Sequence, residues 1–154
     1  MAEETQNTLW MDLAHGRVVI RLRPDLAPKH VARIKELAGE GFYDGIVFHR
    51  VIEGFMAQSG DPTGTGRGGS GRRLAAEFSQ EPYVRGTCGM ARSNDPNSAD
   101  SQFFIMFDDG SFLNGQYTVW GEVVEGMEAV DKIQRREPPR NPDKILRMRV
   151  ADAG

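Results

Sequence analysis

The chain has 154 residues, with 19 basic and 22 acidic side chains for a net charge of −3, and it contains 18 glycines. This length predicts one domain over residues 1–154, with a flexible start over residues 1–7. The charge balance argues against nucleic-acid binding, the lack of a long apolar run argues against a membrane protein, and the glycine content favours a turn-rich fold. Cys88 is the only cysteine and the three histidines are widely spaced, so we expect a cytoplasmic protein with no metal site.

The chain begins with the patterns of a hairpin and a helix. Residues 8–13 and 17–22 are rich in Leu, Val and Ile, and a short link containing Gly16 joins them, which predicts two antiparallel strands. Pro28 suits the first position of a helix, because the N–H that it lacks would be unpaired there anyway. Apolar residues then recur at helical spacing until Gly39, which predicts an amphipathic helix of about ten residues.

The rest of the chain predicts short strands separated by turns. The expected strands cover residues 46–52, 55–58, 87–91, 103–107, 118–124 and 145–151. A second helix is expected over residues 127–134, and the proline-rich residues 138–142 predict a stiff loop. About eight strands with two helices predict a mainly β fold, in which a closed eight-stranded antiparallel barrel is capped by the two helices.

The glycine-rich segment 64–73 carries no convincing cofactor chemistry. Gly64, Gly66 and Gly69 have the spacing of a dinucleotide-binding fingerprint, but turn-forming residues precede them where that fingerprint needs a strand. We therefore interpret the segment as a surface loop and expect no cofactor. Its arginines leave RNA binding as an alternative, which predicts an affinity that falls steeply with salt.

The most informative stretch is residues 48–61, FHRVIEGFMAQSGD. Period-two alternation places Arg50 and Ile52 on one face of a strand, close to phenylalanine, methionine and glutamine side chains. Such a set can form an apolar pocket with charged donors at its rim, or it can be a core strand with a solvated arginine. The residue classes alone leave both interpretations open.

Three motifs taken together resemble the cyclophilin family of peptidyl-prolyl cis-trans isomerases. They are FHRVIEGFMAQSGD, MARSNDPNSADSQFFI and FLNGQYTVWGEVVEGMEAVDKI, and they occur in the order that the family has. The resemblance extends from about Leu13 to Ala151. It implies an eight-stranded antiparallel barrel with a helix closing each end, in agreement with the strands and helices predicted above.

The resemblance also implies the residues of a site. Arg50 matches the catalytic arginine, and Gln58 is expected to orient it. The substrate-binding residues implied are Phe55, Met56, Ala91, Arg92, Gln102, Phe104, Phe112, Leu113 and Tyr117.

Three of these positions depart from the family, and a neighbouring loop residue is of interest. Arg92 stands where many members have Asn, Phe112 where drug-sensitive members have Trp, and Tyr117 where many have His. Phe112 lacks the indole N–H donor, so we expect only weak cyclosporin binding. Tyr117 keeps an aromatic wall, so activity is expected to survive. Arg67 lies where the family varies the gate of the groove, which implies an effect on the residue two before proline.

The function expected from the resemblance is isomerisation of X-Pro bonds in folding or exposed protein segments by a cytoplasmic monomer. The expected partners are proline-containing peptides and unfolded clients, with neither nucleic acid nor membrane. A proline-peptide binding module, or a holding chaperone whose groove does not turn over, remains the rival hypothesis. An Arg50→Ala variant separates the two, because only an enzyme loses its rate far more than its affinity.

Overall fold

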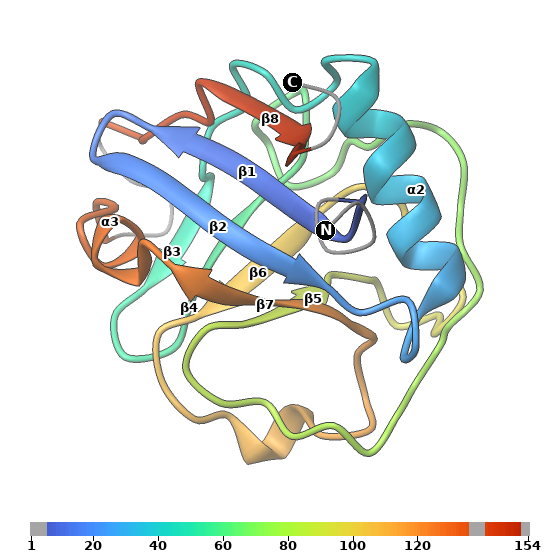
Figure 1. Cartoon of the computed structure of the whole chain (residues 1–154). Coiled ribbons are helices and arrows are strands. Elements are labelled where there is room, and N and C mark those ends of the chain that lie inside the picture. The colour runs from blue at the N-terminus through green and yellow to red at the C-terminus, as the bar shows by residue number, and fades with distance from the viewer. Residues whose placement is uncertain (1–5, 136–140, 152–154) are drawn as a thin grey trace.

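The computed structural model describes residues 6–135 and 141–151, in which the strands form one antiparallel sheet. The strands are β1 (Thr8–Leu13), β2 (Gly16–Leu22), β3 (Arg50–Ile52), β4 (Met56–Ser59), β5 (Thr87–Met90), β6 (Phe103–Met106), β7 (Val119–Glu125) and β8 (Arg147–Val150). The helices are α2 (Pro28–Gly39) and α3 (Met127–Asp131), and a 3-10 turn, η1, covers Ser111–Leu113. Figure 1 shows the sheet curling, with α2 along one side of it and α3 near the opposite side.

The core lies inside the curl of the sheet and confirms the predicted hairpin and first helix. Alternate residues of β1 and β2 are buried, namely Leu9, Met11, Leu13, Val18, Ile20 and Leu22. The helix α2 adds Val31, Ile34 and Leu37 to the same cluster. Apolar residues thus recur at every second position in the two strands and at every third position in the helix. This spacing places one apolar face of each element against the same core.

The structure confirms the predicted mainly β fold, with eight antiparallel strands and two helices among the described residues. The strand order is β3-β4-β6-β5-β7-β2-β1-β8, so β3 and β8 are the two ends of the sheet. The segments that precede these two strands meet at an antiparallel bridge between Val47 and Lys144. Two further backbone hydrogen bonds, Gly45 N to Ile145 O at 2.7 Å and Phe48 N to Asp143 O at 2.9 Å, flank that bridge.

Several predicted elements are shorter in the structure. The strand predicted over residues 46–52 is reduced to β3, because residues 46–48 pair with the segment before β8 instead. The helix predicted over residues 127–134 ends at Asp131. Arg135 contributes to the early end of this helix, because its guanidinium donates hydrogen bonds to the backbone carbonyls of Asp131 and Ile133, each at 2.6 Å.

Some predictions concern parts of the chain that are not described. Residues 1–5 of the predicted flexible start and residues 138–140 of the predicted stiff loop lie outside the described residues. Within residues 6–135 and 141–151, none of the helices has the length and apolar character needed to cross a membrane.

A carboxylate from a distant loop caps the start of α2. Ala27 precedes the helix and offers no capping side chain. Instead, the carboxylate of Glu77 accepts hydrogen bonds from the backbone N–H of Lys29 at 3.1 Å and of His30 at 2.8 Å. The buried His30 ring adds a contact of 2.6 Å from Nδ1 to the same carboxylate. Glu77 thereby supplies the acceptor that helix starts require and ties α2 to the loop before β5.

Stability should fall as the pH drops through the range in which His30 and Glu77 take up protons. Burial lowers the pKa of His30, and this effect outweighs the opposing effect of Glu77. Burial favours a higher pKa for Glu77, but the hydrogen bonds from His30 and Lys29 outweigh it and lower the pKa. Because both groups bind protons more weakly in the folded state, their stabilisation is complete above pH 6.5 and declines below it.

Urea unfolding at pH 7.5 and 5.5 measures this loss. We expect His30 to account for at most about 1.4 kcal/mol of the difference in unfolding free energy. A His30→Asn variant keeps an N–H near the position of Nδ1 but does not titrate, so its pH dependence should be smaller. An equal pH dependence in the variant and the parent would contradict the assignment to His30.

Candidate active site

Three neighbouring strands bring the predicted catalytic residues together. In the β3–β4 pair Arg50 lies opposite Gln58, and in the β4–β6 pair Gln58 lies opposite Phe104. Residues directly opposite each other on antiparallel strands point to the same face of the sheet. The side chains of Arg50, Gln58 and Phe104 therefore form a row across three strands.

A cavity of about 110 Å³ opens beside this row, and we call it the groove. It is lined by Arg50, Phe55, Met56, Gln58, Ala91, Arg92, Phe104, Leu113 and Tyr117. The other two residues predicted for the site lie next to it. Gln102 accepts a hydrogen bond from Gln58 at 3.0 Å, and the ring of Phe112 lies 5.5 Å from the ring of Phe55. The structure thus brings the whole predicted set together, with Phe112 the most exposed at 69%.

The floor of the groove is a small apolar cluster that is separate from the core inside the sheet. Its buried members are Met56, Tyr83, Phe104, Met106, Leu113 and Val119. Met56, Phe104 and Leu113 are each less than a tenth exposed, although all three line the groove. These side chains therefore pack as core residues and also present one edge to the cavity. A ring that enters the groove would meet a dry, apolar surface.

Tyr83 supports this floor, and the sequence analysis missed it. Its ring stacks on Phe104 with 5.7 Å between the centroids, and its hydroxyl donates to the backbone oxygen of Tyr117 at 2.8 Å. Burial raises the pKa of Tyr83, so the hydroxyl stays protonated and keeps donating. Tyr83 lies in an irregular stretch before β5 where no periodic pattern identifies it.

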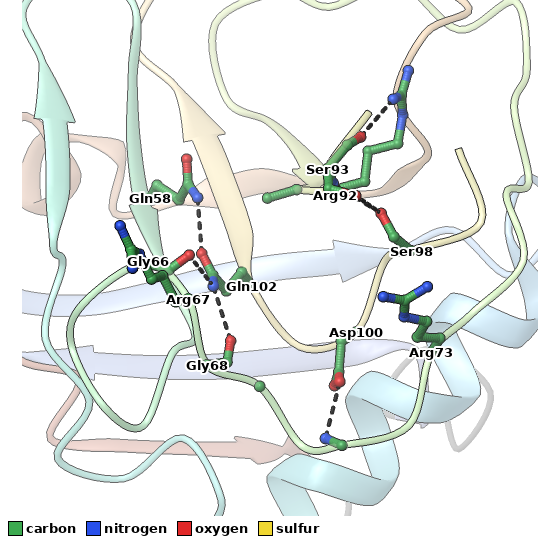
Figure 2. A pocket seen from close by; sticks show the side chains of 13 residues that line it. Gln58, Gly66, Arg67, Gly68, Arg73, Arg92, Ser93, Ser98, Asp100 and Gln102 are labelled. Carbon is green, nitrogen blue, oxygen red and sulfur yellow. Dashed lines mark hydrogen bonds between the residues drawn. The ribbon is translucent and has the colours of Figure 1, made fainter. Parts of the chain in front are cut away.

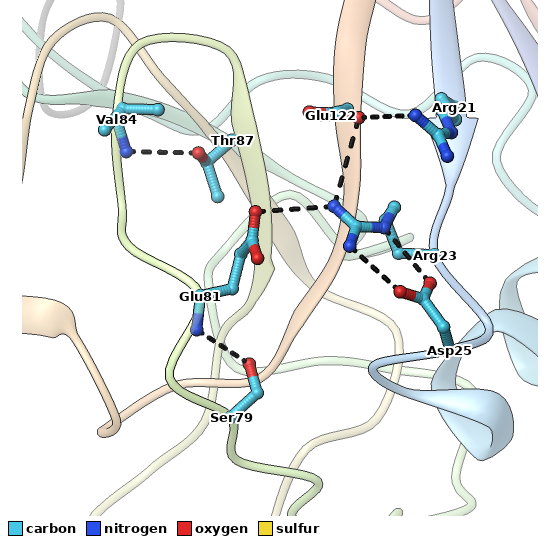
Figure 3. Close-up of polar contacts among 8 residues, drawn as sticks. All are labelled: Arg21, Arg23, Asp25, Ser79, Glu81, Val84, Thr87 and Glu122. Atoms are coloured by element: carbon cyan, nitrogen blue, oxygen red, sulfur yellow. Dashed lines mark hydrogen bonds and ion pairs between the residues drawn. The ribbon is translucent and has the colours of Figure 1, made fainter.

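An ion-pair network anchors the loop that carries Tyr83. Figure 3 shows the guanidinium of Arg23 between three carboxylates. It lies 2.9 Å from Asp25, 3.3 Å from Glu81 and 4.0 Å from Glu122 of β7. The hydrogen bond from Arg23 lowers the pKa of Asp25, against the smaller effect of burial. The network joins the end of β2, β7 and the loop that carries Tyr83, and so holds the floor of the groove in place.

Gln58 connects the groove to the glycine-rich segment. Its side-chain N–H donates to Oε1 of Gln102, and Nε2 of Gln102 donates to the backbone oxygens of Gly66 at 3.0 Å and Gly68 at 2.9 Å. Figure 2 shows this chain of hydrogen bonds from Gln58 through Gln102 to the loop. The two glutamines therefore fix each other's orientation. They also link the β3–β4 pair, which carries Arg50, to the glycine-rich segment.

Two carboxylates hold the rest of the glycine-rich segment. Asp61 accepts from the N–H groups of Thr63 at 2.8 Å and Gly66 at 2.6 Å, and Asp100 accepts from those of Ser70 at 2.8 Å and Gly71 at 2.9 Å. Burial favours a higher pKa for Asp61, but the hydrogen bonds that it accepts outweigh burial and hold the pKa well below its usual value. Both carboxylates are thus occupied with backbone N–H groups of the loop.

Arg92 forms a fixed wall of the groove. Its guanidinium donates to the backbone oxygen of Gln116 at 2.7 and 3.0 Å and to that of Ser93 at 2.9 Å. It also lies 4.7 Å from the centre of the Tyr117 ring, which in turn packs edge-on against Phe104. Two of the three departures from the family pattern, Arg92 and Tyr117, are therefore in contact with each other.

The lining of the groove suits electrostatic stabilisation better than proton transfer. Arg50 and Arg92 are its charged residues, and among the residues that the structure describes no carboxylate, histidine, serine or cysteine lines it. A guanidinium stays charged and offers several N–H donors in a fixed arrangement. The groove can therefore bind an apolar ring and direct donors at an adjacent group that gains electron density.

Comparison with known proteins assigns the chain to a family. A family model described as cyclophilin type peptidyl-prolyl cis-trans isomerase/CLD matches residues 8–150. A probable peptidyl-prolyl cis-trans isomerase of Brucella suis is 56% identical to the chain, over 97% of the chain and 85% of that protein.

Two solved structures also resemble this fold. A cyclophilin of Hirschia baltica has a TM-score of 0.89 at 30% identity, covering 96% of this chain and 75% of that one. A Cryptosporidium parvum cyclophilin type peptidyl-prolyl cis-trans isomerase, crystallised in the presence of the dipeptide Ala-Pro, has a TM-score of 0.86 at 30% identity, covering 93% of this chain and 98% of that one. With the family model matched from β1 to β8, the chain belongs to the cyclophilin-type peptidyl-prolyl cis-trans isomerases.

Proposed function

We propose that X-Pro bonds isomerise in the groove, with the proline ring against Phe55, Met56, Phe104 and Leu113 and with Arg50 directed at the amide. The observation that carries this proposal is the position of the half-buried Arg50, which lines a cavity with an apolar floor and lies opposite Gln58. The Cryptosporidium parvum cyclophilin was crystallised in the presence of the dipeptide Ala-Pro, which supports a proline-containing substrate for this chain.

The chemistry of the bond explains why an arginine is sufficient. Rotation about a peptide bond crosses a barrier of about 18–20 kcal/mol, because the planar form is stabilised by resonance. At the twisted transition state this resonance is lost, and the nitrogen lone pair becomes an acceptor. A donor held at that point binds the transition state more tightly than either planar form, which lowers the barrier. Lowering it by about 6 kcal/mol accelerates the reaction on the order of 10⁴-fold.

The other groove residues would position the substrate. Gln58, held by Gln102, orients Arg50, and the backbone at Ala91 and Arg92 together with Gln102 holds the chain on either side of the proline. Exclusion of water by the apolar floor strengthens the interaction of the guanidinium with the substrate. Exposed X-Pro bonds in folding chains are the substrates that we propose.

The location of the protein, its oligomeric state and its lack of a nucleic-acid partner are predictions. A cytoplasmic location rests on the composition, with Cys88 buried and unpaired in the structure. The monomeric state and the absence of a nucleic-acid partner also remain predictions. We further infer that the bridge between Val47 and Lys144 and its flanking hydrogen bonds close the sheet into a barrel.

Exchange NMR on an Ala-Ala-Pro-Phe peptide tests the proposed function. The cis and trans forms of the peptide interconvert in tens of seconds or longer when uncatalysed. Addition of the protein in an amount far below that of the peptide should produce exchange peaks between the two forms. A proline-binding module or a holding chaperone would shift the peptide resonances without producing exchange peaks. That second result would contradict the proposal and establish the rival.

Cyclosporin should bind weakly, and a single substitution should strengthen the binding. Phe112 is exposed beside Phe55 at the edge of the groove, but its ring has no hydrogen-bond donor. A Phe112→Trp variant adds an indole N–H at this place, so its dissociation constant should fall about 3- to 10-fold. Titration followed by tryptophan fluorescence or calorimetry measures the change. An unchanged affinity would show that the missing donor does not account for the weak binding.

A further inference from the structure

One side of the groove is formed by an irregular segment between β6 and β7. Residues 110–117, which we call the lip, contain η1 and supply Leu113 and Tyr117 to the lining of the groove. Figure 1 shows η1 as the short orange coil at the bottom of the view, outside the sheet. Most of the lip is exposed, and its hydrogen bond from Gln116 N to Leu113 O is local. Exposed segments with local bonds tend to adopt several conformations, so a rigid lip needs contacts with the rest of the fold.

Tyr83, in the loop before β5, binds the lip at three points. Its backbone N–H donates to Oδ1 of Asn114 at 2.8 Å, and its backbone oxygen accepts from the N–H of Gly110 at 2.9 Å. Its hydroxyl donates to the backbone oxygen of Tyr117 at 2.8 Å. Tyr83 is only 1% exposed, so a buried residue makes these bonds. A single residue therefore joins the start, the middle and the end of the lip to the loop before β5.

The ring of Tyr83 has a fixed place, because β5 leaves room for it at Gly89. A Cβ at Gly89 would lie 2.6 Å from the hydroxyl oxygen of Tyr83 and 2.6 Å from Cζ of Phe104, so a larger residue does not fit there. The Tyr83 ring also stacks on Phe104, with an angle of 21° between the two rings. The ring therefore cannot shift without moving the floor of the groove. Packing, as well as the hydrogen bond, directs the hydroxyl at the lip.

Arg92 holds the same segment through the neighbouring carbonyl. Its Nε and one terminal nitrogen donate to Gln116 O at 3.0 and 2.7 Å, and its other terminal nitrogen donates to Ser93 O at 2.9 Å (Figure 2). The guanidinium also lies 4.7 Å from the centre of the Tyr117 ring. This contact uses the planar arrangement of donors that a guanidinium has and a shorter amide side chain lacks. All three nitrogens of the Arg92 guanidinium thus donate to protein backbone.

We propose that Tyr83 and Arg92 are positioning residues for the isomerase, which hold the lip in the conformation that receives the proline ring. This inference rests on the proposed function, because it concerns the same groove. The two side chains bind adjacent carbonyls, Tyr83 from the buried side and Arg92 at the surface. A lip that is already ordered spares the substrate the entropic cost of ordering it. Because the lip faces the proline ring in the planar and twisted forms alike, it should affect binding rather than bond rotation.

Substitution of Tyr83 tests the first contact against a matched control. Tyr83→Phe keeps the ring but removes the hydroxyl, so KM for the Ala-Ala-Pro-Phe peptide should rise by about 2- to 4-fold with kcat unchanged. Tyr43→Phe is the control, because Tyr43 is also buried and its hydroxyl donates to Ser101 O at 3.0 Å, but it does not line the groove. The control should lose a similar amount of thermal stability and keep the parent KM.

Substitution of Arg92 tests the second contact. Arg92→Met should raise KM by a similar factor. Arg135→Met is the control, because Arg135 also donates to two backbone carbonyls, of Asp131 and Ile133, and lies 3.9 Å from the centre of the Phe107 ring, but it does not line the groove. Arg92→Lys keeps the charge without the planar donors, so it should behave like Arg92→Met. A parent KM in Arg92→Lys would show that Arg92 acts through its charge, and would overturn its assignment as a positioning residue.

The Tyr83→Phe, Arg92→Met double variant gives the sharpest result. If both residues hold one lip conformation that predominates in the parent, the increase in KM should exceed the product of the two single increases and reach more than about 10-fold. Two independent substrate contacts would give the product instead, which would contradict the proposal. Circular dichroism confirms that each variant is folded.

Hydrogen exchange gives a readout that does not depend on the double variant. The amide N–H groups of Leu113 and Gln116 are bonded to carbonyls within the lip. They should exchange faster in Tyr83→Phe and in Arg92→Met than in the parent, because opening of the lip becomes easier. The two control variants should leave these exchange rates unchanged.

Failure of this inference is distinct from failure of the proposed function. An unchanged KM in the double variant, unchanged lip exchange in the single variants, or equal changes in the controls would overturn the inference, while turnover of the peptide by the parent still supports the isomerase. A fall in kcat without a rise in KM would also overturn it, because the lip would then act on the twisted form. If the parent does not turn over the peptide, the proposed function itself has failed.

Discussion

Replacement of Arg50 by Ala should reduce kcat/KM for an X-Pro peptide by about 100- to 1000-fold, the usual effect of removing a donor that stabilises a transition state. The apolar floor formed by Met56, Phe104 and Leu113 is untouched by this change. Because the guanidinium is proposed to act mainly on the twisted amide, the dissociation constant of the peptide should rise by less than about fivefold. Exchange NMR gives the rate, and a titration gives the affinity.

An Arg21→Ala variant is the control for the loss of one positive charge. Arg21 is on β2 with its side chain 64% exposed. The kcat/KM of the Arg21→Ala variant should therefore match that of the parent protein. If Arg50→Ala keeps its rate, Arg50 does not stabilise the transition state. If rate and affinity fall together by the same factor, Arg50 binds planar and twisted forms equally, and its assignment as the catalytic group is wrong.

Replacement of Gly60 by Ala should lower the free energy of unfolding by about 3 kcal/mol. Gly60 follows β4 with a φ of +98°, a conformation that residues with a Cβ rarely adopt. The added methyl group would also meet the backbone oxygen of Ser101 and lie 2.8 Å from the Cα of Gln102. The substitution thus strains the backbone and pushes on the residue that joins Gln58 to the glycine-rich segment.

Urea denaturation measures the loss, and Gly39→Ala provides the matched control. Gly39 is the last residue of α2, and an added Cβ there has no neighbour within 4 Å. Alanine also favours a helix over glycine, so this variant should be as stable as the parent or more stable by up to about 1 kcal/mol. A Gly60→Ala variant as stable as Gly39→Ala would show that the close approach of the two backbones is not rigid.

The parts of the fold that depend on local pattern could be predicted from the sequence. Leu9, Met11 and Leu13 alternate with half-buried residues in β1, and Val31, Ile34 and Leu37 recur every three residues in α2. Such periods fix which face an element buries, whatever it packs against. The groove residues were identified from the resemblance of motifs, since pattern alone left Arg50 as either a solvated residue or a site residue.

The contacts that position the groove could not be predicted, because they join residues far apart in the sequence. Tyr83 stacks on Phe104, Glu77 caps α2, and Arg23 pairs with Glu81, all from segments without a repeating pattern. The strand β3 is shorter than predicted for the same reason, because residues 46–48 pair with a segment about a hundred residues later in the sequence. Local propensity carries no information about such partners, and tertiary pairing overrides it.

The structure of this protein with a proline-containing peptide bound is the most direct test of the central claim. We expect the proline ring to lie in the 110 Å³ cavity against Phe104 and Leu113. A guanidinium N–H of Arg50 should lie within about 3 Å of the proline nitrogen or of the carbonyl oxygen of proline. A peptide bound elsewhere on the surface, or a proline in the groove with Arg50 directed away from it, would contradict the claim.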